Sequence, residues 1–190
     1  NFVPVWRPPF IDKLASEDRC HLNGMAMENG VPKYVTALGA CNTPQGWREN
    51  ITSGGILMDV TTNEMILNGL AMPHSPRMYK GELYLLQSAS GELVKVNVAE
   101  RSSTIIKKFE GFCRGLSIYG DYAFIGFSKL RKNSSTFAKL AFSDKANFSG
   151  IKIIHLPTQA EVGEITFESS VDEIYEVVIL PEMIRPNVLS

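Results

Sequence analysis

Hydrophobic and polar residues alternate along most of the chain, and short turns that contain glycine interrupt the alternation. A period of two residues is the pattern of a strand with one buried face. No window of helical length keeps a 3.6-residue period with caps at both ends, and the best helical candidate is the short stretch Pro9–Asp18. The pattern therefore predicts an all-β, mostly antiparallel fold with less than about a tenth of its residues in helix.

The predicted strands fall into groups of four that are joined by hairpin turns. Three groups are complete, a fourth begins at Asp172–Leu180 and stops, and Phe2–Trp6 has the pattern of an outer strand from a preceding group. The complete groups are His21–Met27, Lys33–Leu38, Gly55–Val60 and Glu64–Leu70; His74–Tyr79, Glu82–Gln87, Glu92–Asn97 and Ser103–Phe109; and Cys113–Ile118, Tyr122–Phe127, Gly150–His155 and Glu161–Phe167.

The spacing of these groups indicates a repeat protein. It scatters around the roughly 40 to 50 residues of a four-stranded propeller blade, and insertions in the loops 39–53 and 128–149 explain the excess. We therefore predict a partial β-propeller of about three four-stranded antiparallel blades plus edge strands. It would be a single domain over residues 1–190 and the C-terminal part of a longer chain. The alternative is an open sheet stack or a β-sandwich.

Composition limits the classes of partner. Nineteen Lys and Arg oppose twenty Asp and Glu, for a formal charge of -1, so we expect no nucleic acid as partner. No apolar stretch approaches the roughly 18 residues of a membrane span, so we expect no membrane contact. Cys20, Cys41 and Cys113 are odd in number and widely spaced, which favours a reducing, cytoplasmic location. Export stays open, because the sequence opens at Asn1 without a methionine.

Several long motifs carry a family resemblance over nearly the whole chain. They are Trp6-Arg7-Pro8-Pro9-Phe10, Asp18-Arg19-Cys20-His21-Leu22-Asn23-Gly24, Gly46-Trp47-Arg48-Glu49-Asn50, Pro73-His74-Ser75-Pro76-Arg77, Arg114-Gly115-Leu116-Ser117, Gly120-Asp121-Tyr122-Ala123-Phe124 and Val171-Asp172-Glu173-Ile174. With them the chain resembles a family of uncharacterised bacterial conserved hypothetical proteins. The resemblance implies propeller-like repeats, a longer N-terminus and an occasional association with tetratricopeptide repeats. It implies no activity and no catalytic residue.

Polar residues at the openings of the groups are the candidates for a site. The first strand of each propeller blade lines the central channel, so residues distant in sequence converge there. The candidates at these openings are His21, Asn23, His74, Arg77, Arg114, Asp172 and Glu173.

These candidates suit two kinds of chemistry. His21, His74 and Glu173 are competent ligands for one divalent metal ion, whereas hydrogen bonds to backbone groups are the alternative role of the histidines. Asn23 with Asp172 and Glu173 would instead suit calcium through oxygen donors. Arg77 and Arg114 are suited to clamping a carboxylate or phosphate. An internal salt-bridge network is the alternative for the arginines.

Trp47 and Arg48 lie in a long polar loop and complete the ligand-binding candidates. A tryptophan there is either a lid over the channel mouth, a contact for another protein, or a ring packed on the neighbouring blade.

The sequence contains no G-x-S-x-G elbow and no phosphate-binding glycine loop. We therefore expect a binding or interaction module for a protein or a small polar ligand. The alternative is a metal-assisted hydrolase or lyase with its site at the propeller axis. Because three blades leave open sheet edges, we also expect more chain or a second copy, in a homo-oligomer, to complete them.

Overall fold

The computed structural model describes residues 3–130, 137, 140–144 and 146–184 of the chain. Twelve strands and a short 3-10 helix, η1 (Gly46–Asn50), lie in this part. The strands are β1 (Leu22–Glu28), β2 (Val31–Ala37), β3 (Gly55–Asp59), β4 (Met65–Leu70), β5 (Pro73–Tyr79), β6 (Glu82–Gln87), β7 (Glu92–Asn97), β8 (Ser102–Lys108), β9 (Phe112–Tyr119), β10 (Tyr122–Ser128), β11 (Gly150–His155) and β12 (Ala160–Thr166).

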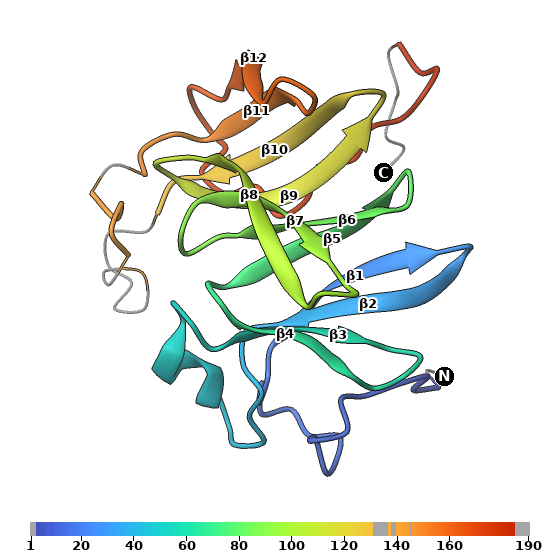
Figure 1. The fold of residues 1–190 in the computed structure, drawn as a ribbon. Helices are drawn as coiled ribbons and strands as arrows, with labels where there is room; N and C mark the ends of the chain where they lie inside the picture. Colours follow the sequence, from blue (N-terminus) through green and yellow to red (C-terminus); the bar gives the residue numbers. More distant parts are fainter. Residues whose placement is uncertain (1–2, 131–136, 138–139, 145, 185–190) are drawn as a thin grey trace.

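The strands form three antiparallel sheets of four consecutive strands each, β1–β4, β5–β8 and β9–β12. Figure 1 shows the three sheets one above another, in chain order from blue to orange. The first strand of the middle sheet, β5, contacts both β1 and β9, so each sheet is a blade that places its first strand innermost. The fold is all-β, a partial propeller of three four-stranded antiparallel blades, and the prediction of its class is confirmed.

The hydrophobic core lies between the blades, and the middle blade contributes to it from both faces. On β6, Leu85 packs toward the first blade, whereas its neighbour Leu86 packs toward the third. On β7, Val94 packs toward the first blade and Leu93 toward the third. Successive strand side chains point to opposite faces, so a blade covered on both sides needs an unbroken apolar run. Each fully buried leucine contributes about 1.5 to 3 kcal/mol of burial free energy.

The N-terminal segment is neither the strand nor the helix that its sequence predicted. Residues 3–6 join no strand, and no helix forms over Pro9–Asp18. Pro4, Pro8 and Pro9 carry no amide hydrogen for a strand ladder, and the chain turns where Ile11 N donates to Pro8 O at 3.0 Å. Ile11 then packs with Cys20 and residues of β2 and β3, so this segment covers the outer face of the first blade.

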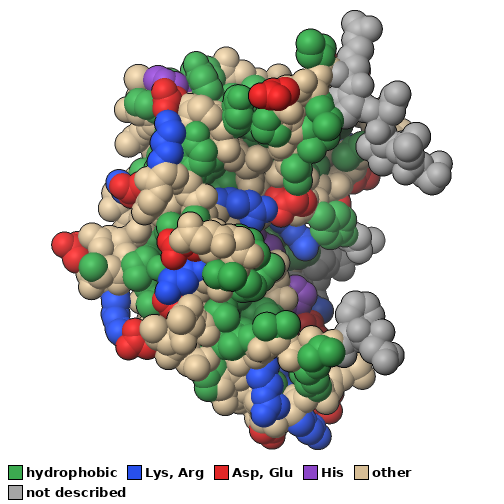
Figure 2. Space-filling view, turned by 90° about the vertical axis from the view of Figure 1, so that its right-hand side faces the viewer, with side chains coloured by type: hydrophobic (Ala, Val, Ile, Leu, Met, Phe, Trp, Pro, Cys, Tyr) green, Lys and Arg blue, Asp and Glu red, His purple; other side chains and the backbone are tan. Residues whose placement is uncertain are grey.

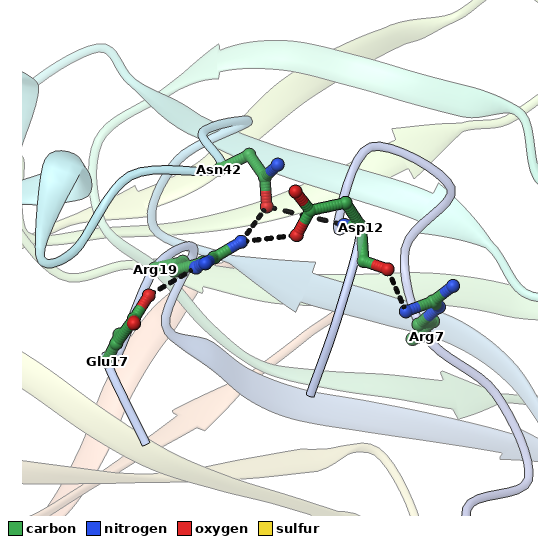
Figure 3. Close-up of polar contacts among 5 residues, drawn as sticks. All are labelled: Arg7, Asp12, Glu17, Arg19 and Asn42. Carbon is green, nitrogen blue, oxygen red and sulfur yellow. Dashed lines mark hydrogen bonds and ion pairs between the residues drawn. The ribbon is translucent and has the colours of Figure 1, made fainter. Parts of the chain in front are cut away.

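A partly buried arginine, Arg19, fastens this segment to the loop after β2 (Figure 3). Arg19 Nη1 donates to Asp12 Oδ1 and to Asn42 Oδ1, both at 2.6 Å, and its Nε donates to Glu17 Oε2 at 2.7 Å. Arg7 Nη1 donates to the backbone oxygen of Asp12 at 2.7 Å. The Arg19 hydrogen bond holds the pKa of the Asp12 carboxyl below its usual range. We call Asp12, Glu17, Arg19 and Asn42 the Arg19 clamp.

The segment Asp172–Leu180 was predicted to open a fourth group as a strand, and that prediction is wrong. It lies along β9 and β10 without joining their ladder. Its backbone bonds mainly to side chains: Ile174 N donates to Ser128 Oγ at 2.8 Å, and Ile179 N donates to Ser117 Oγ at 3.3 Å. Hydroxyl groups therefore replace the backbone partners that a strand would need. No helix in the described residues has the length and apolar character needed to cross a bilayer.

Candidate ligand site at the inner strands

Each inner strand carries an irregularity at the same level. The register of β1 shifts at Asn23, that of β5 at Ser75–Pro76, and that of β9 at Arg114–Gly115. Ser75 has a φ of 50° and Gly115 a φ of 84°, both in the left-handed region. Bulges of this kind bend a strand and redirect its side chains, and they are common beside functional sites. The polar candidates at the blade openings thus lie on the bulged parts of their strands.

Hydrogen bonds connect the three bulges. Asn23 Nδ2 donates to Pro73 O at 3.0 Å, and Gly115 N donates to the buried Ser75 Oγ at 3.1 Å. Gly115 must be a glycine, because a Cβ there would lie 2.8 Å from Val177 N in addition to the strain of its φ. The three inner strands and the segment that follows β12 are therefore held together at this level.

His74 is buried, with 4% of its surface exposed. Its Nδ1 lies 3.0 Å from Met72 O and 2.8 Å from Ser88 Oγ, and Ser88 Oγ donates to Cys113 O at 2.6 Å. Burial, and then the positive charge of Arg114, lower the pKa of His74 to about 4. The histidine is therefore neutral at physiological pH and is bonded to backbone and hydroxyl groups, which was the alternative role predicted for it.

The two arginines of the inner strands differ in their partners. Arg77 Nη2 donates to Glu176 Oε2 at 2.6 Å, so Arg77 takes part in an internal salt bridge. The guanidinium of Arg114 is half-buried and lies 4.4 Å from the ring centre of Tyr175. Burial lowers the pKa of Arg114 below its usual range. Within the described part of the chain, no oxygen accepts a hydrogen bond from its guanidinium.

His21 and Trp47 form a separate cluster with Asp18. His21 Nδ1 lies 2.8 Å from Asp18 Oδ1, Trp47 Nε1 donates to Asp18 Oδ2 at 3.0 Å, and the two rings are 4.7 Å apart. Arg48 lies 4.3 Å above the Trp47 ring. Trp47 is 6% exposed and belongs to the same hydrophobic cluster as Met72, whereas a role as a lid stays a prediction.

The acidic candidates lie on the segment after β12. Glu173 Oε2 accepts a hydrogen bond from Tyr175 Oη at 2.6 Å, and Asp172 pairs with Lys129 at 3.1 Å. No three His, Cys, Asp or Glu side chains of the described residues are grouped to hold a metal ion. The structure therefore does not assemble His21, His74 and Glu173 as a ligand set, and the divalent ion stays a prediction. Figure 2 shows acidic and basic side chains interspersed on one face, with histidines near its middle and at its upper left edge.

Sequence reasoning missed Ser75, Ser88 and Tyr175. Ser75 lies in the motif Pro73-His74-Ser75-Pro76-Arg77 and Tyr175 in the predicted strand Asp172–Leu180, but neither residue was named as a candidate for the site. Ser88 directly follows β6, and nothing in the sequence connects it with Cys113 of the next blade.

A family model described as a domain of unknown function, DUF4915, matches residues 1–189. The chain belongs to the DUF4915 family. This agrees with the resemblance to uncharacterised proteins, whereas a bacterial origin and an association with tetratricopeptide repeats stay predictions. No curated protein matches the DUF4915 chain.

Solved structures share the fold at low sequence identity. The computationally designed Ika4 protein aligns with a TM-score of 0.52 at 8% identity, over 90% of this chain and 84% of that one. Hydrazine synthase from Kuenenia stuttgartiensis aligns at 0.50 and 14% identity, over 84% of this chain and 40% of that one. The β-propeller domain of Cps50 (Swd1) from Myceliophteria thermophila gives 0.47 at 9% identity, covering 79% and 43%. At these identities the likeness to the first two structures concerns the fold alone.

Proposed function

We propose that this DUF4915 chain is a binding module on a propeller scaffold, and that the bulged parts of its inner strands receive a small polar ligand with an anionic group. The observation that carries the proposal is Arg114, a half-buried guanidinium without a hydrogen-bond acceptor in the described part of the chain. A charge that is partly removed from water is costly unless something pairs with it. A bound anion would supply that pair.

The surroundings of Arg114 favour a bound anion over an internal one. The guanidinium lies over the Tyr175 ring, a contact that uses the face of the ring and none of its own N–H groups, and those N–H groups have the fork geometry that matches a carboxylate or phosphate. Glu176 is already bonded to Arg77, and Glu173 to the Tyr175 hydroxyl. The nearest carboxylates therefore have other partners.

Thermal unfolding of the purified chain in sodium acetate and in sodium phosphate, each against sodium chloride of equal ionic strength, tests the proposal. At an anion concentration of ten times Kd, we expect the melting temperature to rise by about 3 to 6 °C. The Arg114→Gln variant should lose this rise. Arg101→Gln is the matched control, because Arg101 pairs with Glu64 at 3.4 Å outside the site.

The control should respond like the unaltered chain. An equal rise in all three proteins would be a general salt effect and would contradict the proposal. The absence of any rise with either anion would contradict it too.

A further inference from the structure

We infer that the ligand is a monocarboxylate with a hydroxyl group next to its carboxyl group. Arg114 binds the carboxylate, and His74 Nε2 accepts the hydrogen of the hydroxyl. The inference rests on the proposed function, because it takes Arg114 as the group that binds the anion. It adds an acceptor to that site and thereby names the class of ligand.

The hydrogen bonds around His74 fix its tautomer. Ser88 Oγ donates its only hydrogen to Cys113 O, so it can offer His74 only a lone pair. Met72 O is likewise an acceptor only. Both groups within reach of Nδ1 thus require a hydrogen on Nδ1. In a neutral imidazole with Nδ1 protonated, Nε2 carries a lone pair and accepts.

This acceptor has no donor from the chain. In the part of the molecule that the structure describes, no N–H or O–H group is bonded to His74 Nε2, and the residue as a whole is 4% exposed. Nε2 is not among the fully buried side-chain atoms that lack a partner in this part of the chain, so the atom is open to solvent and a ligand can reach it. A ligand that brings a hydroxyl would satisfy the atom, whereas a ligand with acceptors alone would not.

The acceptor and the cation belong to the same place in the fold. Arg114 stands between two residues that are bonded to the middle blade. On one side, Cys113 O accepts a hydrogen bond from Ser88 Oγ. On the other side, Gly115 N donates to the Oγ of Ser75, the residue after His74. These two hydrogen bonds between the blades hold the bulges of β5 and β9 together. Accordingly, the charge of Arg114 acts on the His74 imidazole and helps to keep it neutral.

The charges around Arg114 favour a single negative charge on the ligand. Glu173 and Glu176 are close enough for their charges to favour the protonated form of Arg114. The same charges would repel a second negative charge on a bound anion, since like charges near a protein surface interact strongly at short range. A monocarboxylate fits this balance better than a phosphate dianion.

Isothermal titration with three sodium salts at pH 7.5 tests the inference. Glycolate carries the hydroxyl, methoxyacetate keeps the oxygen without its hydrogen, and acetate lacks both. We expect glycolate to bind roughly tenfold more tightly than either of the others, which is the value of about one hydrogen bond. Inorganic phosphate should bind more weakly than glycolate.

Two variants assign the groups. His74→Asn keeps an amide N–H close to the position of Nδ1 but has no atom at Nε2. It should bind all three acids equally, with acetate within about twofold of its affinity for the unaltered chain. Arg114→Gln should lose all three acids, and Arg101→Gln should behave like the unaltered chain.

The outcomes separate this inference from the proposed function. Equal affinity of the unaltered chain for the three acids, with all binding lost in Arg114→Gln, would overturn the hydroxyl preference and leave the anion site in place. Tighter binding of phosphate than of glycolate would overturn it as well. No binding of any acid, or binding that survives Arg114→Gln, would overturn both. If His74→Asn does not fold, the affinities of the unaltered chain for glycolate, methoxyacetate and acetate still test the hydroxyl preference.

Discussion

Arg77 and Arg114 occupy neighbouring inner strands, yet they contribute differently to the stability of the fold. The chain supplies a carboxylate for Arg77, from Glu176, and an aromatic ring for Arg114, from Tyr175. A residue that is incompletely paired in the free protein is typical of a binding site, where stability is given up for a ligand. The two residues can therefore be distinguished by mutation without knowledge of the ligand.

We expect Arg114→Met to leave the free energy of unfolding unchanged or to raise it by up to about 1 kcal/mol, because it removes a half-buried charge. Arg77→Met should lower it by about 0.2 to 1 kcal/mol, since that pair is partly exposed. Urea unfolding of both variants in the absence of added carboxylates measures the difference. A larger loss from Arg114→Met than from Arg77→Met would show that the chain itself compensates Arg114.

His74 makes the stability of the chain depend on pH. Its pKa is lowered from 6.5 to about 4 in the folded chain. Between these values the unfolded chain binds more protons, so this contribution is fully present above pH 6.5 and is lost as the pH falls toward 4. The loss at pH 5 is about 2 kcal/mol.

The stability difference between the unaltered chain and His74→Asn should therefore shrink by about 2 kcal/mol from pH 7 to pH 5. Urea unfolding at the two pH values gives this difference, and groups that titrate alike in both proteins cancel from it. A difference that stays constant with pH would mean that His74 titrates alike in the folded and unfolded chain.

At the scale of the elements, the alternation of residues was sufficient to predict the strands. Their observed bounds lie close to the predicted ones, because each hairpin carries its own turn signal and needs only local partners. The terminal segments were mispredicted, because their partners are side chains: Ser117 and Ser128 bond the segment after β12. The site was less predictable still. That Ser88 meets Cys113 depends on how two blades pack, which no local pattern encodes.

The Arg19 clamp makes a prediction about the N-terminal segment. Arg19→Met should loosen this segment from the loop after β2 and increase its cleavage by protease, because the side chain is only 10% exposed and donates to three acceptors. Asn42 Oδ1 would keep a second donor, Asp12 N at 3.4 Å. Limited proteolysis followed by mass spectrometry locates the cuts. Arg101→Met, which disrupts an exposed pair, is the control. Equal cleavage of both variants would show that apolar packing alone holds the segment.

At the scale of the whole molecule, each gap between blades has its own apolar cluster, and the N-terminal segment covers the first blade from outside. Strand β12 lies at the opposite end and has mostly exposed residues. We predict that further chain or a second copy covers the end with β12. Light scattering on the purified chain distinguishes a 21.1 kDa monomer from a homo-oligomer.

The middle blade, whose adjacent leucines on β6 belong to two different clusters, has a consequence for hydrogen exchange. Its amides cannot open to solvent unless both clusters separate, whereas opening β12 disturbs the periphery alone. We expect the amides of β6 and β7 to exchange with deuterium at the rate of global unfolding, and those of β12 to exchange faster by orders of magnitude. Exchange measured by NMR or mass spectrometry would reveal this gradient, and uniform protection across the three blades would instead mean that they open only as one unit.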